Sequence, residues 1–93
     1  MRVIKRNGRA EEFDSSKIKT SLANTSDSIN EPLTQGDLNS ITNEVADKIK
    51  SRYKNEITYI QIRDLIIENL KNRAFFNIVK AYRNSNGLKK NQI

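Results

Sequence analysis

The chain has 93 residues, with 17 Lys+Arg against 11 Asp+Glu, and it contains neither Cys nor His. This length allows one small domain with a thin core. The missing Cys and His exclude thiolate nucleophiles, imidazole bases and zinc sites built from those side chains. The net charge of +6 favours partners that carry phosphate, but charge alone fits simple solubility equally well. Because no apolar run is as long as a signal peptide or a membrane span, we expect a cytoplasmic protein without membrane contact.

The first predicted element is a β-hairpin at about residues 2–13. Val3 and Ile4 begin an extended segment, and Asn7-Gly8 follows it closely. This dipeptide is typical of a type I′ turn, because both central residues of that turn need positive φ. The hairpin is therefore expected to turn at Asn7 and Gly8.

A helix is predicted to follow over about residues 15–24. Asp14 is a good N-cap, since its carboxylate can accept hydrogen bonds from the amides of the first turn. Phe13 before the cap and Ile18 four residues after it have the spacing of a hydrophobic staple, which would fix the angle between strand and helix. The polar segment 25–28 is expected to end this helix.

Three further helices are predicted, over about residues 35–53, 59–71 and 74–85. Their apolar residues recur at spacings of three and four, as on a helix with one buried face. Thr58 and Gln61 have the spacing of a capping box at the start of the second of these helices. The predicted fold is therefore mainly α, a four-helix bundle capped by an N-terminal β-hairpin.

The last helix is expected to end near Gly87, which can adopt the left-handed conformation of a C-cap. The domain is then expected to span residues 1–87. Residues 88–93 would form a basic, flexible tail.

Carboxylates and lysines are the side chains that remain for catalysis. Glu11 and Glu12 are neighbours on a strand and point to opposite faces, so they cannot act as a pair. Asp64 and Glu68 have i, i+4 spacing on a helix and could hold a hard cation, but such pairs are usually solvated surface, and no metal site is expected. Gly-rich phosphate loops are absent from the sequence. We therefore do not expect an enzyme.

Four cations surround the predicted junction between the hairpin and the first helix. They are Lys5, Arg6, Arg9 and Lys17. Amide groups at the helix N-terminus would add to their attraction for a phosphate. The other interpretation is that these cations protect an exposed sheet edge from aggregation. On physical grounds alone the two interpretations have equal weight.

The residues of this junction also form a pattern of fixed types and spacings. It consists of Val3-Ile4-Lys5-Arg6-Asn7-Gly8, then Glu11, Phe13-Asp14 and Lys17-Ile18. The pattern resembles the opening of the ATP-cone domain family. Ile57-Thr58 and the closing Tyr82-Arg83 are also similar to segments of that family, so the likeness spans about residues 2–83.

The resemblance implies that ATP or dATP binds beneath the hairpin. It implies that Val3 contacts the adenine through its backbone and that Ile18 packs against the ring. Glu11 and Asp14 would form hydrogen bonds near the base, and the cations of the pattern would neutralise the phosphates together with Mg²⁺. Tyr59 and Arg63 match two further sites near the sugar and phosphates, where some relatives have Thr and His. The implied nucleotide-binding residues are Val3, Ile4, Lys5, Arg6, Asn7, Gly8, Glu11, Asp14, Lys17, Ile18, Tyr59 and Arg63.

The resemblance further implies a regulatory function. ATP cones are known as the N-terminal allosteric domain of ribonucleotide reductases and as part of the repressor of their genes. We therefore expect a sensor of adenine nucleotides that changes shape or oligomerises, with a ribonucleotide reductase, another protein or a second copy of the chain as partner. Since no reductase barrel or zinc ribbon accompanies the pattern, and Met1 directly precedes it, a free-standing domain is expected rather than an excised one.

Two other functions are left open. A small basic nucleic-acid-binding protein could use the hairpin cations and the acid-free segment that follows Glu68. That interpretation lacks a known recognition motif, and the aromatic residues Phe75, Phe76 and Tyr82 have the helical spacing of core residues. The other alternative is a degenerate cone that has lost its ligand and serves only in protein–protein contacts.

Overall fold

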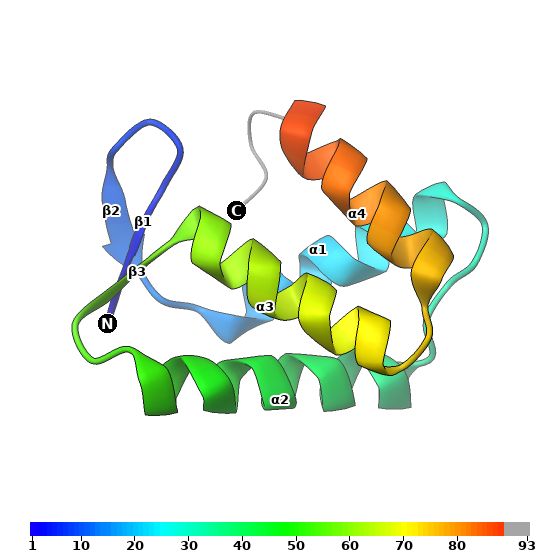
Figure 1. Ribbon diagram of the computed structural model, residues 1–93, viewed down its shortest axis with the longest axis horizontal. Helices are drawn as coiled ribbons and strands as arrows, with labels where there is room; N and C mark the ends of the chain where they lie inside the picture. The colour runs from blue at the N-terminus through cyan, green and yellow to red at the C-terminus, as the bar shows by residue number, and fades with distance from the viewer. Residues whose placement is uncertain (89–93) are drawn as a thin grey trace.

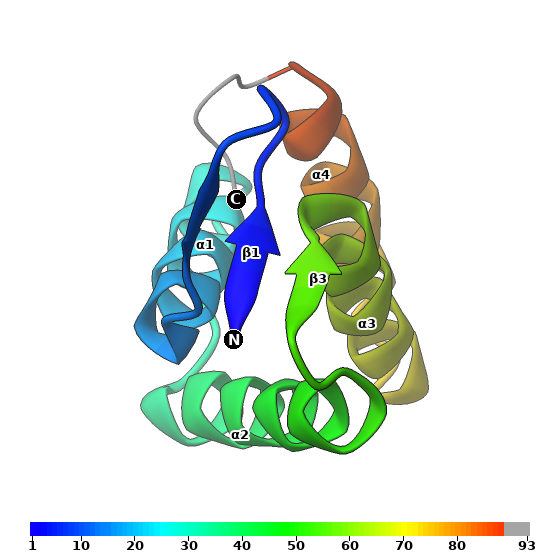
Figure 2. The ribbon, with the colours of Figure 1, turned by 90° about the vertical axis from the view of Figure 1, so that its left-hand side faces the viewer.

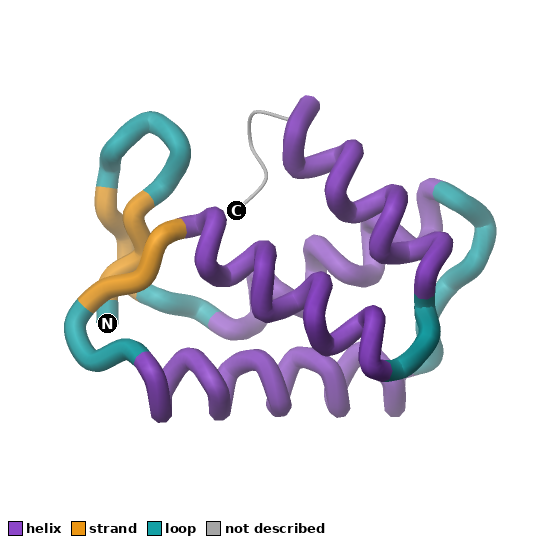
Figure 3. Tube along the Cα trace, viewed as in Figure 1, coloured by secondary structure: helices purple, strands orange, loops and turns teal. Residues whose placement is uncertain are grey.

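The computed structural model describes residues 1–88 and places a small sheet at one end of four helices (Figures 1 and 3). The elements, in chain order, are β1 (Arg2–Ile4), β2 (Ala10–Glu12), α1 (Ser15–Ser28), α2 (Gln35–Arg52), β3 (Glu56–Thr58), α3 (Tyr59–Asn72) and α4 (Phe76–Leu88). The prediction of a mainly helical fold, with four helices after a hairpin, is confirmed. In the described part of the chain, no helix combines the length and apolarity needed to cross a membrane.

The helices contact one another as a closed ring, in which α1 meets α2 and α4, and α3 meets the same two helices (Figure 2). The predicted apolar faces point into this ring. Ile41 and Ile49 of α2 and Ile66 and Leu70 of α3 have no exposed surface. Burial of these side chains is the main force that holds the helices together.

A third strand, β3, was not predicted. It pairs in parallel with β1, so that Val3 lies opposite Ile57, and the strand order is β2-β1-β3. Thr58 was expected only to cap the following helix, and no strand was predicted here, because three residues are too few to show an alternating pattern and their partner lies far away in the sequence. The pairing makes β1 the central strand and joins the hairpin to the residues just before α3 (Figure 2).

The hairpin loop differs from the predicted type I′ turn. It has three residues, Arg6 to Gly8, and the Lys5 amide donates a hydrogen bond of 2.8 Å to the Arg9 carbonyl across them. The φ angle is positive at Gly8 (84°) but not at Asn7. Asn7 instead accepts a hydrogen bond from the Arg9 amide through Oδ1, at 3.0 Å. A three-residue loop with Gly in the left-handed region is a common alternative to the type I′ turn.

Helix α1 is longer than predicted, since residues 25–28 continue it instead of ending it. Thr25 and Ser26 are buried. The Ser26 hydroxyl donates to the Ala23 carbonyl at 3.1 Å, and the Ser28 hydroxyl donates to the Thr25 carbonyl at 2.7 Å. The hydroxyls of Ser26 and Ser28 therefore bond to carbonyls of the helix itself. They do not stabilise a competing, non-helical conformation of the backbone, which is the usual reason that Ser disfavours a helix.

Helix α4 continues through Leu88, so the prediction that Gly87 ends it is wrong. A glycine inside a helix costs only about 1 kcal/mol relative to alanine, and the helix extends past it. Of the predicted basic tail at residues 88–93, only Leu88 belongs to the described residues. The remainder of that prediction lies outside them.

The start of α4 also differs from the prediction. Ala74, expected in the helix, lies in the turn before it with a φ angle of 64°. Phe76 is 63% exposed, whereas Ile78 and Tyr82 are almost fully buried. The prediction that these aromatic residues belong to the core is therefore confirmed for Tyr82. It is wrong for Phe76, because the first turn of α4 points this side chain away from the core.

Candidate functional site

A small cavity lies beneath the hairpin, where β1 and β2 meet the start of α1. Its volume is about 20 Å³, and its lining residues are Val3, Glu11, Glu12, Phe13, Asp14, Lys17, Ile18 and Ile62. The apolar members Val3, Ile18 and Ile62 are each at most 5% exposed. The volume is of the order that one water molecule needs, so the cavity is much smaller than a purine ring.

Five of the predicted site residues line this cavity, and three lining residues were not predicted. Glu12 and Phe13 come from β2 and the residue that follows it. Ile62 comes from α3, four residues after its N-cap. The signal that could have found Ile62 is the confirmed capping box, in which Thr58 accepts from the Gln61 amide and Gln61 accepts from the Thr58 amide.

Asp14 holds the start of α1, as predicted. Its Oδ1 accepts hydrogen bonds from the Ser16 hydroxyl at 2.7 Å and from the Ser16 amide at 3.0 Å. The Ser16 hydroxyl, followed by the Ser16 amide, lowers the pKa of the Asp14 carboxyl. Because Asp14 fixes the first turn of the helix, it also fixes the position of Lys17, one turn further on.

Glu11 joins two of the predicted cations. Lys17 Nζ lies 2.8 and 2.9 Å from the two carboxylate oxygens of Glu11, and Lys5 Nζ lies 3.6 Å from Oε1. The hydrogen bond from Lys17 is the main cause that lowers the pKa of Glu11, and the charge of Lys5 adds to it. An ionised carboxylate thus connects β2, the end of β1 and α1 at the rim of the cavity.

The hairpin loop reaches the start of α3. The guanidinium of Arg6 lies 5.7 Å from the centre of the Tyr59 ring, within the range of a cation–π interaction. Asn7 and Gly8 are exposed in the loop, and Ile4 is half-buried in β1. Among the predicted residues, Arg6 and Tyr59 therefore hold the loop over α3 without lining the cavity.

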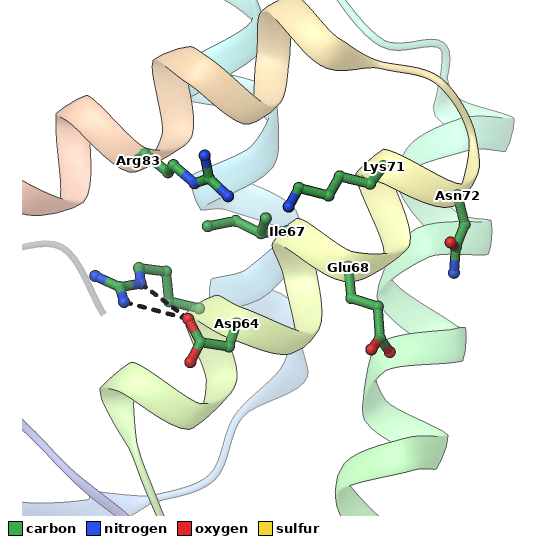
Figure 4. A pocket seen from close by; sticks show the side chains of 7 residues that line it. Asp64, Ile67, Glu68, Lys71, Asn72 and Arg83 are labelled. Carbon is green, nitrogen blue, oxygen red and sulfur yellow. Dashed lines mark hydrogen bonds and ion pairs between the residues drawn. The ribbon is translucent and has the colours of Figure 1, made fainter.

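Arg63 lies apart from this cavity. Its Nη2 is 3.2 Å from Asp64 Oδ1, and it lines a separate cleft between α3 and α4 (Figure 4). The cleft was not predicted, because its residues come from two helices and share no local pattern. The one signal for it in the sequence is the absence of acidic residues after Glu68.

The carboxylates of Asp64 and Glu68 form ion pairs with different cations. Asp64 pairs with Arg63, and Glu68 Oε1 lies 3.1 Å from Lys48 Nζ on α2. Within the described residues, no group of three or more His, Cys, Asp or Glu side chains is placed to hold a metal ion. Anion binding, rather than metal binding, is what the surrounding cations favour.

Comparison with known protein families places the chain. Residues 1–90 match the ATP cone domain, so the matched region covers nearly the whole chain and includes both the hairpin cavity and the α3–α4 cleft. None of the curated proteins compared with the chain matches it.

Proposed function

Because the chain belongs to the ATP cone domain family, whose members are nucleotide-binding regulatory domains, we propose that it senses ATP or dATP by binding the nucleotide beneath the hairpin. The observation that carries the proposal is the cavity under β1. Its apolar floor, formed by Val3, Ile18 and Ile62, lies next to the ammonium groups of Lys5 and Lys17. An apolar floor suits a purine ring, and ammonium groups suit phosphates.

Entry of the base requires the hairpin to move away from α1, because the cavity holds only about 20 Å³. The contacts that resist this movement are the buried side chain of Val3, the pairing of β1 with β3, short strands and partly exposed ion pairs. β1 and β2 have three residues each, and the ion pairs of Glu11 with Lys5 and Lys17 are partly exposed. Such pairs contribute about 0–1 kcal/mol each.

Nucleotide binding would exchange one anion for another at the two lysines. In the closed arrangement the Glu11 carboxylate accepts hydrogen bonds from Lys17 and faces Lys5. Phosphate oxygens can replace that carboxylate as the partner of both ammonium groups, which leaves Glu11 available to accept a hydrogen bond from the base. Mg²⁺ would accompany the phosphates and be held by them rather than by a protein ligand set.

The regulatory output follows from the two positions of the hairpin. A nucleotide that binds the open arrangement better than the closed one shifts the chain toward it by its differential affinity. The hairpin is joined through β3 to α3, so its movement would change the surface around the start of that helix. The partner that responds would be a ribonucleotide reductase, another protein or a second copy of the chain.

Calorimetric titration with ATP and dATP tests the proposal. We expect binding by the wild type, with Lys5→Ala and Lys17→Ala each weakening it about tenfold or more, as expected for the loss of a charged hydrogen bond. Lys50→Ala is the matched control, since Lys50 is an exposed lysine on α2, and it should bind as the wild type does. The absence of heat and of a thermal shift at millimolar nucleotide would refute the proposal.

A further inference from the structure

The hairpin loop holds a chemically reactive pair of residues, Asn7 and Gly8. Neither residue lines the cavity beneath the hairpin. Both are exposed, as are Arg6 and Arg9 on either side of them, and the loop projects beyond the paired strands (Figure 1). Asn is one of the less durable side chains of proteins, because its carbonyl carbon can be attacked by the backbone nitrogen of the next residue. In this loop, water has free access to that reaction.

Two features of the loop favour the attack. Gly8 has no side chain that would hinder its nitrogen, and its φ angle of 84° lies in a region that other residues rarely adopt. The Asn7 Oδ1 atom accepts a hydrogen bond of 3.0 Å from the Arg9 amide. This bond folds the carboxamide of Asn7 back over the peptide unit of Gly8. It also draws electrons away from the carbonyl carbon, which makes that carbon a better target.

One hydrogen bond restrains the attacking nitrogen. The Gly8 amide donates to the Lys5 carbonyl at 2.9 Å, so the attack requires this bond to open. Such openings cost least in short, exposed loops. Asn55 provides a comparison within the chain, because it is also exposed and lies outside the helices and strands. It is followed by Glu56, which has a side chain, and its carbonyl accepts a hydrogen bond of 2.9 Å from the Arg2 amide.

We propose that Asn7 is a site of spontaneous deamidation and that the isoaspartate formed there loosens the hairpin. The Gly8 nitrogen forms a bond to Cγ of Asn7 and gives up its proton, while Nδ2 takes up a proton and leaves as ammonia. Water then opens the resulting five-membered ring at one of its two carbonyls. One opening gives aspartate at residue 7. The other gives isoaspartate, in which the main chain continues through the side-chain carboxyl.

The two products affect the loop differently. Both add one negative charge, but aspartate keeps the normal backbone and an oxygen that can accept from the Arg9 amide. Isoaspartate adds one carbon to the backbone of a loop that is closed by the bond of 2.8 Å from the Lys5 amide to the Arg9 carbonyl. That closure no longer fits, so the end of β1 and the ammonium of Lys5 lose their fixed position. The resulting loss of nucleotide affinity rests on the function proposed above.

Mass spectrometry of the full chain, incubated at mildly alkaline pH, tests the modification. Cleavage after lysine gives residues 6–17, in which Asn7 is the one Asn, and residues 55–71, which contain Asn55. We expect the peptide 6–17 to gain the mass difference between an amide and a carboxyl, and to separate chromatographically into aspartate and isoaspartate forms. The peptide 55–71 should stay unchanged over the same period. The second Asn-Gly pair, Asn86-Gly87, lies in α4 and falls in a different peptide, residues 81–89.

The variants Asn7→Gln and Asn7→Asp separate the effect of isoaspartate from the effect of charge. Asn7→Gln keeps the carboxamide but cannot form the five-membered ring, so the incubated variant should keep its mass and its affinity for ATP. Freshly purified Asn7→Asp carries the charge on a normal backbone. Its affinity should stay within about fivefold of the wild type, as expected for one exposed charge. The incubated wild type should lose ATP binding in proportion to its content of isoaspartate.

The proposal is overturned if the peptide 6–17 keeps its mass or changes no faster than the peptide 55–71. It is also overturned if a chain rich in isoaspartate binds ATP as the fresh chain does. If the fresh chain does not bind ATP either, the nucleotide site fails, but the modification still stands or falls by the mass change. Hydrogen exchange at the Lys5 and Arg9 amides then decides whether isoaspartate loosens the hairpin, with faster exchange as the expected result and unchanged exchange as the contrary one.

Discussion

The helical ring and the hairpin junction of this domain are held together by different forces. In the ring, large apolar side chains such as Ile41, Ile49 and Ile66 have no exposed surface. At the junction, the side chains of Val3 and Ile18 are buried in the same core, but the strands are short and the ion pair between Glu11 and Lys17 is partly exposed. Buried apolar surface contributes roughly 25 cal/mol per Å², whereas an exposed ion pair contributes about 0–1 kcal/mol. The ring therefore supplies most of the stability, and the proposed function requires the junction to rearrange while the ring stays folded.

The largest effect is expected from a cavity in the ring. Ile66→Ala removes a side chain with no exposed surface and should lower the free energy of unfolding by about 3–4 kcal/mol. Urea denaturation followed by circular dichroism measures this change. Ile60→Ala, on the same helix but 43% exposed, should cost less than about 1 kcal/mol. Equal losses in the two variants would contradict the division between ring and surface.

A smaller effect is expected where α1 meets α4. The Ser21 hydroxyl donates a buried hydrogen bond of 3.0 Å to the Tyr82 hydroxyl. Tyr82→Phe leaves the Ser21 hydroxyl buried without this partner and should destabilise the domain by about 1–2 kcal/mol. The double variant Ser21→Ala/Tyr82→Phe should recover part of the loss, because neither half of the pair is then left unsatisfied. A double variant less stable than Tyr82→Phe would show that the hydrogen bond is not the cause.

Lys17→Ala is expected to separate stability from binding. The Lys17 side chain is 52% exposed, so the loss of its ion pair with Glu11 should lower the free energy of unfolding by less than about 1 kcal/mol. Nucleotide affinity should nevertheless fall as described above. Thermal unfolding with and without ATP measures both quantities on one sample. A large loss of stability without nucleotide would place Lys17 among the residues that hold the fold.

A modest effect of pH is expected at the junction. The pKa of Glu11 is lowered in the folded chain by Lys17 and Lys5. The stabilisation of the fold by the ion pairs of Glu11 is therefore fully present above the ordinary carboxyl pKa, about 4.3. It is lost as the pH falls through the lowered pKa of Glu11. Glu11→Gln should show a shallower decline of the melting temperature between pH 6 and about pH 3 than the wild type. Parallel curves for the two chains would show that the Glu11 ion pairs do not contribute.

The smallest effect is expected at Thr42 in α2. Its Oγ1 is the one buried side-chain polar atom without a hydrogen-bond partner among the described residues. Thr42→Val keeps the shape of the side chain and removes this hydroxyl, so stability should stay the same or rise by up to about 1 kcal/mol. Urea denaturation detects the change, and a loss of more than about 1 kcal/mol would mean that the hydroxyl has a partner in solution.

The parts of the fold that could be predicted are those with local signals. The apolar period of α2 and α3, the Asp14 cap and the Thr58–Gln61 capping box all depend on residues within a few positions of each other. β3 could not be predicted, because its three residues gain their partner only when β1 is placed beside them. The predicted end of α1 was wrong because the hydroxyls of Ser26 and Ser28 find hydrogen-bond partners inside the helix.

The same distinction applies to the hairpin cavity and to the cleft between α3 and α4. Most residues of the hairpin cavity lie within residues 3–18, so the sequence pattern brings them together directly. Ile62 enters the cavity only through the position of α3 relative to the hairpin. The α3–α4 cleft depends on helix packing alone, because its residues come from two helices and share no local pattern along the chain.

Hydrogen exchange with and without ATP tests most directly whether the hairpin moves over a stable helical ring to bind nucleotide. We predict that saturating ATP changes the exchange rates of amides in residues 3–18 and at the start of α3. Amides in the middle of α2 should exchange at the same slow rate in both states. Unchanged exchange in the hairpin, or an equal change throughout the ring, would contradict binding beneath a mobile hairpin.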